Sequence, residues 1–193
     1  VGEFAAQILL DYPSKMVKDG AENKPVDDLE ALFLAARPRF VYTHNLADKH
    51  DTHVATALKV IAALRRLPVS ARPEKVYGCE VWRGLDWMIN ADKVSLDLSG
   101  HENLQVALLG VFDSQIAGGK RYDLATMGRR RANATYFESH GVDNSLGLSY
   151  AMDMTPLLTD PQMDSAVFLQ EFIQRFALEI TDRMRRLGPG QSA

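Results

Sequence analysis

The sequence predicts an α/β protein in which helices cover both faces of a mainly parallel sheet. Two observations lead to this prediction. Short runs rich in β-branched and aromatic residues alternate with longer segments whose apolar residues recur every three or four positions. The length of 193 residues and the hydrophobic content of 46% also suffice for one sizeable core. Ligands in such folds bind beyond the carboxyl ends of the strands, so we expect a site in the strand-to-helix loops.

The first half of the chain shows the alternation clearly. Residues 1–7 have the character of a helix end, and the apolar run at residues 8–13 closes with proline, which is typical of a strand that ends in a loop. Apolar residues spaced by three and four predict an amphipathic helix over residues 26–37. The β-rich run at residues 40–44 predicts a strand, and residues 52–67 form the long helical pattern that follows it.

The second half repeats the pattern with weaker signals. Residues 76–82 and 94–98 predict two further strands, separated by turn-forming residues. Helical patterns follow over residues 102–112 and 124–139, and the segment 114–123, which contains two adjacent glycines, is predicted to be a loop between them.

The last helical pattern covers residues 165–186. We therefore predict one α/β domain over residues 1–187 and a disordered tail over residues 188–193. The opening residues, Val1-Gly-Glu-Phe-Ala-Ala, have mid-helix character with no cap or turn before them. This opening predicts that an N-terminal part of the domain is missing, and the alternative is that the missing piece lies on another chain.

Composition narrows the classes of partner. The net charge of −3 and the pI of about 6.0 arise from mixed acidic and basic residues, which argues against a nucleic-acid or anionic membrane partner. The single cysteine, Cys79, excludes an internal disulfide framework and suits a reducing compartment. There is no run of 18 apolar residues and no signal-peptide pattern, so we expect a cytoplasmic protein with a small-molecule substrate. The sequence leaves a homo-oligomer open.

Three of the five histidines lie in one strand-to-helix loop, residues 43–53. His50 and His53 are three residues apart at a predicted helix start, so both imidazoles can project from one face. Imidazole is a common zinc ligand, and Asp48 or Asp51 is near enough to accept the second ring N–H and fix the tautomer. The same spacing also occurs in surface or capping histidines, and on spacing alone this alternative is the more frequent one.

This loop resembles the second signature of LmbE-like (PIG-L-type) zinc-dependent N-deacetylases. The resemblance rests on the stretch Val41-Tyr42-Thr43-His44-Asn45, on Asp48, and on His50-Asp51-Thr52-His53 followed by an Ala- and Leu-rich helix. Weaker similarity extends over the strand at residues 76–82, the strand end at Asp97, residues 113–115 and residues 136–138.

The resemblance implies a Rossmann-like sheet that carries one zinc ion and removes the acetyl group of an N-acetylglucosamine-type sugar or sugar conjugate. By position, His53 matches the zinc ligand of that signature, and His50 matches the histidine that stabilises the oxyanion of the tetrahedral intermediate. Asp51 and Thr52 stand where the family usually has Pro and Asp, and Asp48 is the expected replacement for the lost carboxylate.

The first signature of the family, His-Pro-Asp-Asp at the end of the first strand, is absent from the chain. It would supply two zinc ligands and the general base, so we expect this chain to be an incomplete and inactive portion of the enzyme. The alternative is a non-catalytic sugar-binding or assembly module with the same fold.

Candidate substrate contacts flank the histidine loop. His44 and Asn45 end the predicted strand, where the alternative role is hydrogen bonding within the loop. Trp82 and Arg83 follow the next strand, where an aromatic face and a guanidinium suit a sugar, and the alternative is a loop packed on the core. Cys79 is expected to be a buried small residue rather than a nucleophile.

Overall fold

The structure is a computed structural model that describes residues 3–189. Residues 190–193 of the predicted disordered tail thus lie outside the described residues. The chain divides into two compact units. Within the described residues, unit 1 comprises residues 3–9 and Ser95–Tyr150, and unit 2 comprises Leu10–Val94 and residues 151–189. The predicted single domain over residues 1–187 stays a prediction.

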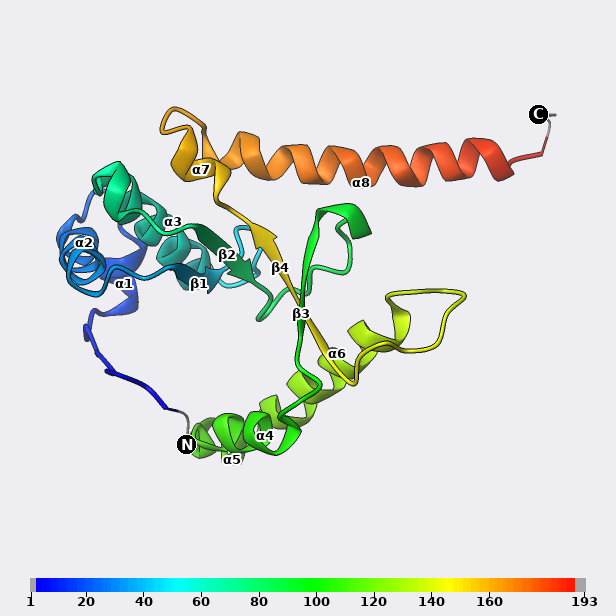
Figure 1. Cartoon of the computed structure of the whole chain (residues 1–193), viewed down its shortest axis with the longest axis horizontal. Coiled ribbons are helices and arrows are strands. Elements are labelled where there is room, and N and C mark those ends of the chain that lie inside the picture. The colour runs from blue at the N-terminus through cyan, green and yellow to red at the C-terminus, as the bar shows by residue number, and fades with distance from the viewer. Residues whose placement is uncertain (1–2, 190–193) are drawn as a thin grey trace. The chain divides into compact units, whose positions relative to one another are not determined.

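Both units contain helices and strand residues, and the α/β class is confirmed (Figure 1). The helices are α1 (Ser14–Lys18), α2 (Lys24–Ala36), α3 (Asp51–Arg66), α4 (Glu102–Gly110), α5 (Asp113–Ala117), α6 (Tyr122–Tyr136), α7 (Pro156–Thr159) and α8 (Ser165–Leu187). The strands are β1 (Phe40–His44), β2 (Lys75–Cys79), β3 (Lys93–Asp97) and β4 (Leu148–Asp153), and two short 3₁₀ turns cover Val69–Ala71 and Asn90–Asp92.

The four strands form a small mixed sheet in the order β1-β2-β4-β3. β1 and β2 are parallel, with register from Phe40 opposite Lys75 to His44 opposite Cys79. β4 is antiparallel to β2, with Tyr77 opposite Asp153. The prediction of a mainly parallel sheet is therefore corrected, because a short apolar run predicts a buried strand without indicating its direction.

Helix α3 provides the main packing surface of unit 2. Its apolar residues Ala57, Ile61 and Leu64 are at most 2% exposed, and it packs against β1, α1 and α2 (Figure 1). An acidic residue in its first turn and Arg65 and Arg66 in its last turn complement the helix dipole. This packing fixes the first turn of α3 beside the end of β1, where the histidine loop lies.

Two basic side chains of α3, Lys59 and Arg65, bind loops of unit 2 to this core. The Lys59 ammonium is buried and donates to the backbone oxygens of Asp19, at 2.8 Å, and Glu22, at 2.5 Å. The Arg65 guanidinium donates to the oxygens of Leu157 and Met163, which holds the turn around α7. These bonds give four loop carbonyls a charged donor.

Unit 1 packs around the start of β4. Tyr150 is 1% exposed and donates its O–H to the backbone oxygen of Asn133 at 2.8 Å, and the Asn133 amide donates to the Leu148 oxygen. α4, α5 and α6 contact one another in this unit. The unit has few buried side chains, so it is less tightly packed than unit 2.

Several predicted elements differ from the structure. Residues 8–13 contain no strand, residues 3–7 are not helical, and the predicted loop at residues 114–123 contains most of α5. β4 and α7 were not predicted. Within residues 3–189, no helix is both long enough and apolar enough to cross a membrane.

Candidate functional site

The candidate site lies where the parallel strands β1 and β2 end. Because parallel strands bring their carboxyl ends to the same edge, the loops after His44 and Cys79 lie next to each other. The backbone N–H of Asn45 donates to the Cys79 oxygen at 3.1 Å, which joins the two loops at their first residue. Gly78 makes this approach possible, because a Cβ atom there would lie 3.0 Å from the Asn45 Cα.

Asn45 organises the loop from inside. Its side chain is 0% exposed, its amide donates to the Cys79 oxygen at 2.9 Å, and its amide oxygen accepts the N–H of Ala47 at 3.0 Å. In this conformation the side chain offers no surface to a substrate. These two hydrogen bonds give Asn45 a positioning role in the loop, and the substrate contact predicted for it stays a prediction.

Asp48 is the central anchor of the site. Its side chain is 0% exposed, and its two carboxylate oxygens accept the backbone N–H groups of His50 at 2.9 Å, Trp82 at 3.0 Å and Arg83 at 3.4 Å. Burial raises the pKa of this carboxyl group, but the three N–H donors and nearby His53 outweigh burial, so its pKa lies below 3.8. One ionised carboxylate thus fastens the histidine loop to the loop after β2.

The three loop histidines form a stack. The rings of His44 and His53 have centroids 3.9 Å apart and planes 6° apart. The rings of His50 and His53 have centroids 4.7 Å apart, and Trp82 lies beyond His50 at 6.3 Å. The structure therefore brings together four of the residues that the sequence singled out.

The His44 ring sits at the inner end of the stack. Its Nδ1 is buried and makes no hydrogen bond among the described residues. Burial is the main factor that lowers the His44 pKa from 6.5, and His53 and His50 lower it further, against the opposing effect of Asp48. His44 is thus held as neutral imidazole at neutral pH.

His53 faces the anchor. Its Nδ1 lies 3.4 Å from an oxygen of Asp48, which is close enough for attraction but lacks hydrogen-bond geometry, so the nitrogen is buried without a hydrogen bond. A small rotation of the ring would make that bond. It would fix the proton on Nδ1 and leave Nε2 as the nitrogen with a free lone pair.

The stacking of the histidine rings limits which of them could bind one zinc ion. A metal bound to an imidazole lies near the ring plane, about 2.0–2.1 Å from the nitrogen. Because the stacked rings of His44 and His53 are nearly parallel, no point at that distance lies close to both planes. Among residues 3–189, no three His, Cys, Asp or Glu side chains are arranged to hold a metal ion. The described residues therefore show no complete zinc site, and His44 and His53 could not share one ion in this arrangement.

The loop that follows β2 forms the outer wall of the site. Trp82 is 38% exposed and Arg83 is exposed, while the backbone N–H groups of both bind Asp48. Sequence reasoning identified the two side chains and missed this backbone role, for which the sequence carries no pattern. Burial, with a contribution from Glu80, raises the pKa of Cys79 to about 11, which argues against a thiolate nucleophile.

Comparisons with protein-family models, curated proteins and solved structures find no match for this chain. The resemblance to LmbE-like deacetylases thus rests on the sequence motif.

Proposed function

We propose that this chain is the histidine-bearing portion of a zinc-dependent hydrolase that removes the acetyl group from an N-acetylglucosamine-type sugar or sugar conjugate. The parent fold would be the Rossmann-like fold of the LmbE-like deacetylases. The observation that carries the proposal is the buried Asp48 carboxylate, which binds the backbone N–H of His50 and lies 3.4 Å from Nδ1 of His53 at the carboxyl end of β1.

His53 has the surroundings that a metal-ligating histidine needs. A carboxylate behind one ring nitrogen selects the tautomer and raises the basicity of the other nitrogen, and Asp48 is placed for this behind Nδ1. Zinc, when bound, would supply a Lewis acid and an activated water. Since the described residues provide one ligand position, we assign no catalytic step to zinc here.

His50 has a different environment that suits a different role. It is exposed, its backbone N–H is held by Asp48, and its ring stacks beside His53. A protonated imidazole at this place could donate a hydrogen bond to charge that develops on the acetyl oxygen in the transition state. Trp82 and Arg83, on the neighbouring loop, are the proposed sugar contacts.

The remaining ligands would have to come from polypeptide other than residues 3–189. β1 lies at an edge of the sheet, and its Phe40 and Tyr42 side chains are 42% and 57% exposed. The strand carries no charged residue or proline that would block pairing. A strand added parallel to β1 would bring its own carboxyl end to the histidine stack, which supports the proposal of an incomplete site.

A zinc titration of the whole chain, followed by NMR of the imidazole nitrogens, tests the proposal. Zinc should shift Nε2 of His53 with weak, saturable affinity, and the His53→Ala variant should lose the effect. The matched control is His101→Ala, in unit 1, which should leave it unchanged. Zinc that shifts all histidines equally, or none, would contradict the proposal.

The rival function has its own signature in the same experiment. If N-acetylglucosamine shifts the NMR signals of the Trp82 indole and of Arg83, and zinc leaves the His53 signals unchanged, the result would favour the non-catalytic sugar-binding module.

A further inference from the structure

Helix α8 packs on unit 2 through one side of its first half. Phe168 and Phe172 are 4% and 8% exposed, and Phe176 meets the edge of the Trp87 ring with the centroids 6.4 Å apart. The Arg175 guanidinium lies over the Phe172 ring at 4.5 Å. These aromatic contacts anchor the first half of the helix to the unit.

The second half of α8 is not covered by any part of residues 3–189. Every residue from 181 to 187 is exposed, and Figure 1 shows α8 as one uninterrupted helix that continues to its last residue. Met184 and Leu187 are apolar and yet are 70% and 72% exposed. Helix without tertiary packing is marginal in water, because most helical stability in proteins comes from packing of an apolar face. We therefore expect a partner surface for this half of α8.

The open apolar side of α8 has the repeat of a coiled coil. Positions separated alternately by four and three residues hold Ala166, Gln170, Ile173, Ala177, Ile180, Met184 and Leu187. Ile180 is half-buried and the other six are exposed. This alternation averages 3.5 residues over three heptads, which is the period that keeps an apolar seam turned toward a second helix. The seam, meaning these seven positions, thus fits another helix.

The charges of α8 indicate which helix that is. The N-cap and first half, residues 164–174, carry two acidic residues and no basic one, whereas residues 175–187 carry four arginines against two acidic residues. The two halves therefore have net charges of −2 and +2. A second α8 that runs antiparallel would place each negative half beside a positive half and would oppose the two helix dipoles. A parallel copy would place like charges side by side.

We propose that α8 binds α8 of a second copy of this chain as an antiparallel coiled coil. Ile173 of one copy would lie level with Met184 of the other, and the small Ala177 would face Ile180 in the two central layers. The uncovered second half of each helix would pack along the anchored first half of the other. The proposal rests on unit 2 alone and stands whether or not the histidine site binds zinc.

Sedimentation equilibrium of the whole chain over a range of concentrations tests the proposal. The wild type should show a reversible equilibrium between monomer and dimer. Met184→Glu should weaken dimerisation at least about a hundredfold, because a symmetric dimer carries the buried charge twice.

The matched control is Leu178→Glu, which makes the same change of charge at an apolar residue that is 59% exposed. Leu178 lies two residues before Ile180, which places it on the side of the helix away from the seam. Its dissociation constant should stay within about twofold of the wild-type value. Circular dichroism would check that both variants keep their helix content.

Cross-linking with a short bismaleimide tests the direction of the pair, in a Cys79→Ala background that leaves one cysteine per variant. Ala177→Cys lies near the centre of the antiparallel pair and should cross-link the two copies. Leu187→Cys should not, because its two copies would be separated by about 25 Å along the axis at 1.5 Å per residue. Cross-linking of Leu187→Cys would overturn the antiparallel arrangement.

Two further results would overturn the proposal. A wild-type chain that stays monomeric at every concentration would show that the seam does not bind a second copy. Equal effects of Met184→Glu and Leu178→Glu would show that the dimer forms elsewhere on the chain. If the monomeric chain instead binds anionic lipid vesicles and Met184→Glu abolishes that binding, the seam is a membrane-binding face.

Discussion

Nδ1 of His53 lies 3.4 Å from the same Asp48 oxygen that accepts the backbone N–H of His50 at 2.9 Å. One carboxylate oxygen thus lies close to both histidines of the sequence motif. His50 precedes α3, and His53 lies in its first turn. The other carboxylate oxygen fixes the loop after β2 through Trp82. The site is therefore built around the buried negative charge of Asp48.

Replacement of that charge should cost stability. Asp48→Asn should lower the free energy of unfolding by about 1–3 kcal/mol at neutral pH, because buried N–H groups lose an ionised acceptor. Asp51→Asn, an exposed change in the first turn of α3, should cost about 0.5 kcal/mol or less. Urea denaturation followed by circular dichroism measures both. Equal losses in the two variants would show that Asp48 is not an anchor.

The Asp48 effect should depend on pH in one direction. The folded pKa lies below 3.8 and the unfolded value is about 3.9, so the stabilisation is complete above the unfolded pKa and is lost as pH falls through the folded one. The stability gap between the wild type and Asp48→Asn should therefore be constant near neutrality and shrink below about pH 4. A gap that widens in acid would contradict this.

His44 should remain neutral well into mild acid. Its pKa is lowered from 6.5 mainly by burial, so the unfolded chain binds the proton at higher pH than the folded chain does. Stability should fall as pH drops below about 6.5, and His44→Gln should remove part of that fall. NMR titration of the ring gives the pKa directly, and a value at or above 6.5 would refute the prediction.

Gly78 should be sensitive to a single methyl group. A Cβ there would lie 2.9 Å from the Met154 sulfur and 3.0 Å from the Asn45 Cα, and the second neighbour is backbone that cannot rotate away. Gly78→Ala should cost about 1–3 kcal/mol and disturb the loop that carries Asp48. Gly100→Ala, with no atom within 4 Å, is the control and should be within about 0.5 kcal/mol of wild type. Similar costs at both positions would show that the contact is unimportant.

The local pattern of apolar and polar residues predicted β1 and α3, the strand and helix on either side of the histidine loop. The β-rich run before His44 and the periodic segment after Asp51 are β1 and α3 at nearly the predicted bounds, because both patterns are strong and local. The antiparallel β4, Leu148–Asp153, was missed although buried and partly buried residues largely alternate along it, with Ala151 as the departure. Strand direction depends on contacts with distant strands, which periodicity does not encode.

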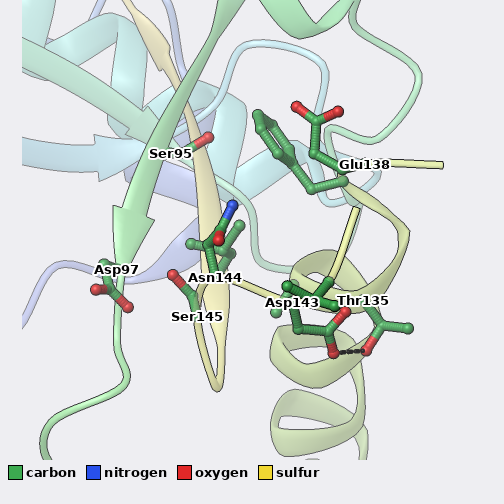
Figure 2. Close-up of a pocket in the computed structure, with 11 residues that line it drawn as sticks. Ser95, Asp97, Thr135, Glu138, Asp143, Asn144 and Ser145 are labelled. Carbon is green, nitrogen blue, oxygen red and sulfur yellow. Dashed lines mark hydrogen bonds between the residues drawn. The ribbon is translucent and has the colours of Figure 1, made fainter. Parts of the chain in front are cut away.

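The sequence predicted which residues lie in the site better than it predicted the role of each residue. The histidine spacing placed His50 and His53 together, as found. The burial of Asn45 and the use of the Trp82 and Arg83 backbones depend on how two loops meet, so no motif reveals them. A hollow in unit 1 joins Ser95 and Asp97 to residues between 134 and 148, and only the fold brings these segments together (Figure 2).

The most direct test of the account is the zinc content of the whole chain after dialysis, with His53→Ala and His101→Ala in parallel. We predict substoichiometric zinc in the wild type and in the His101→Ala control, with a dissociation constant weaker than about 10 μM, equivalent to about −7 kcal/mol, and still less in His53→Ala. One tightly held zinc per chain, lost in His53→Ala, would mean that residues of this chain complete the site and would contradict the account of a single ligand position.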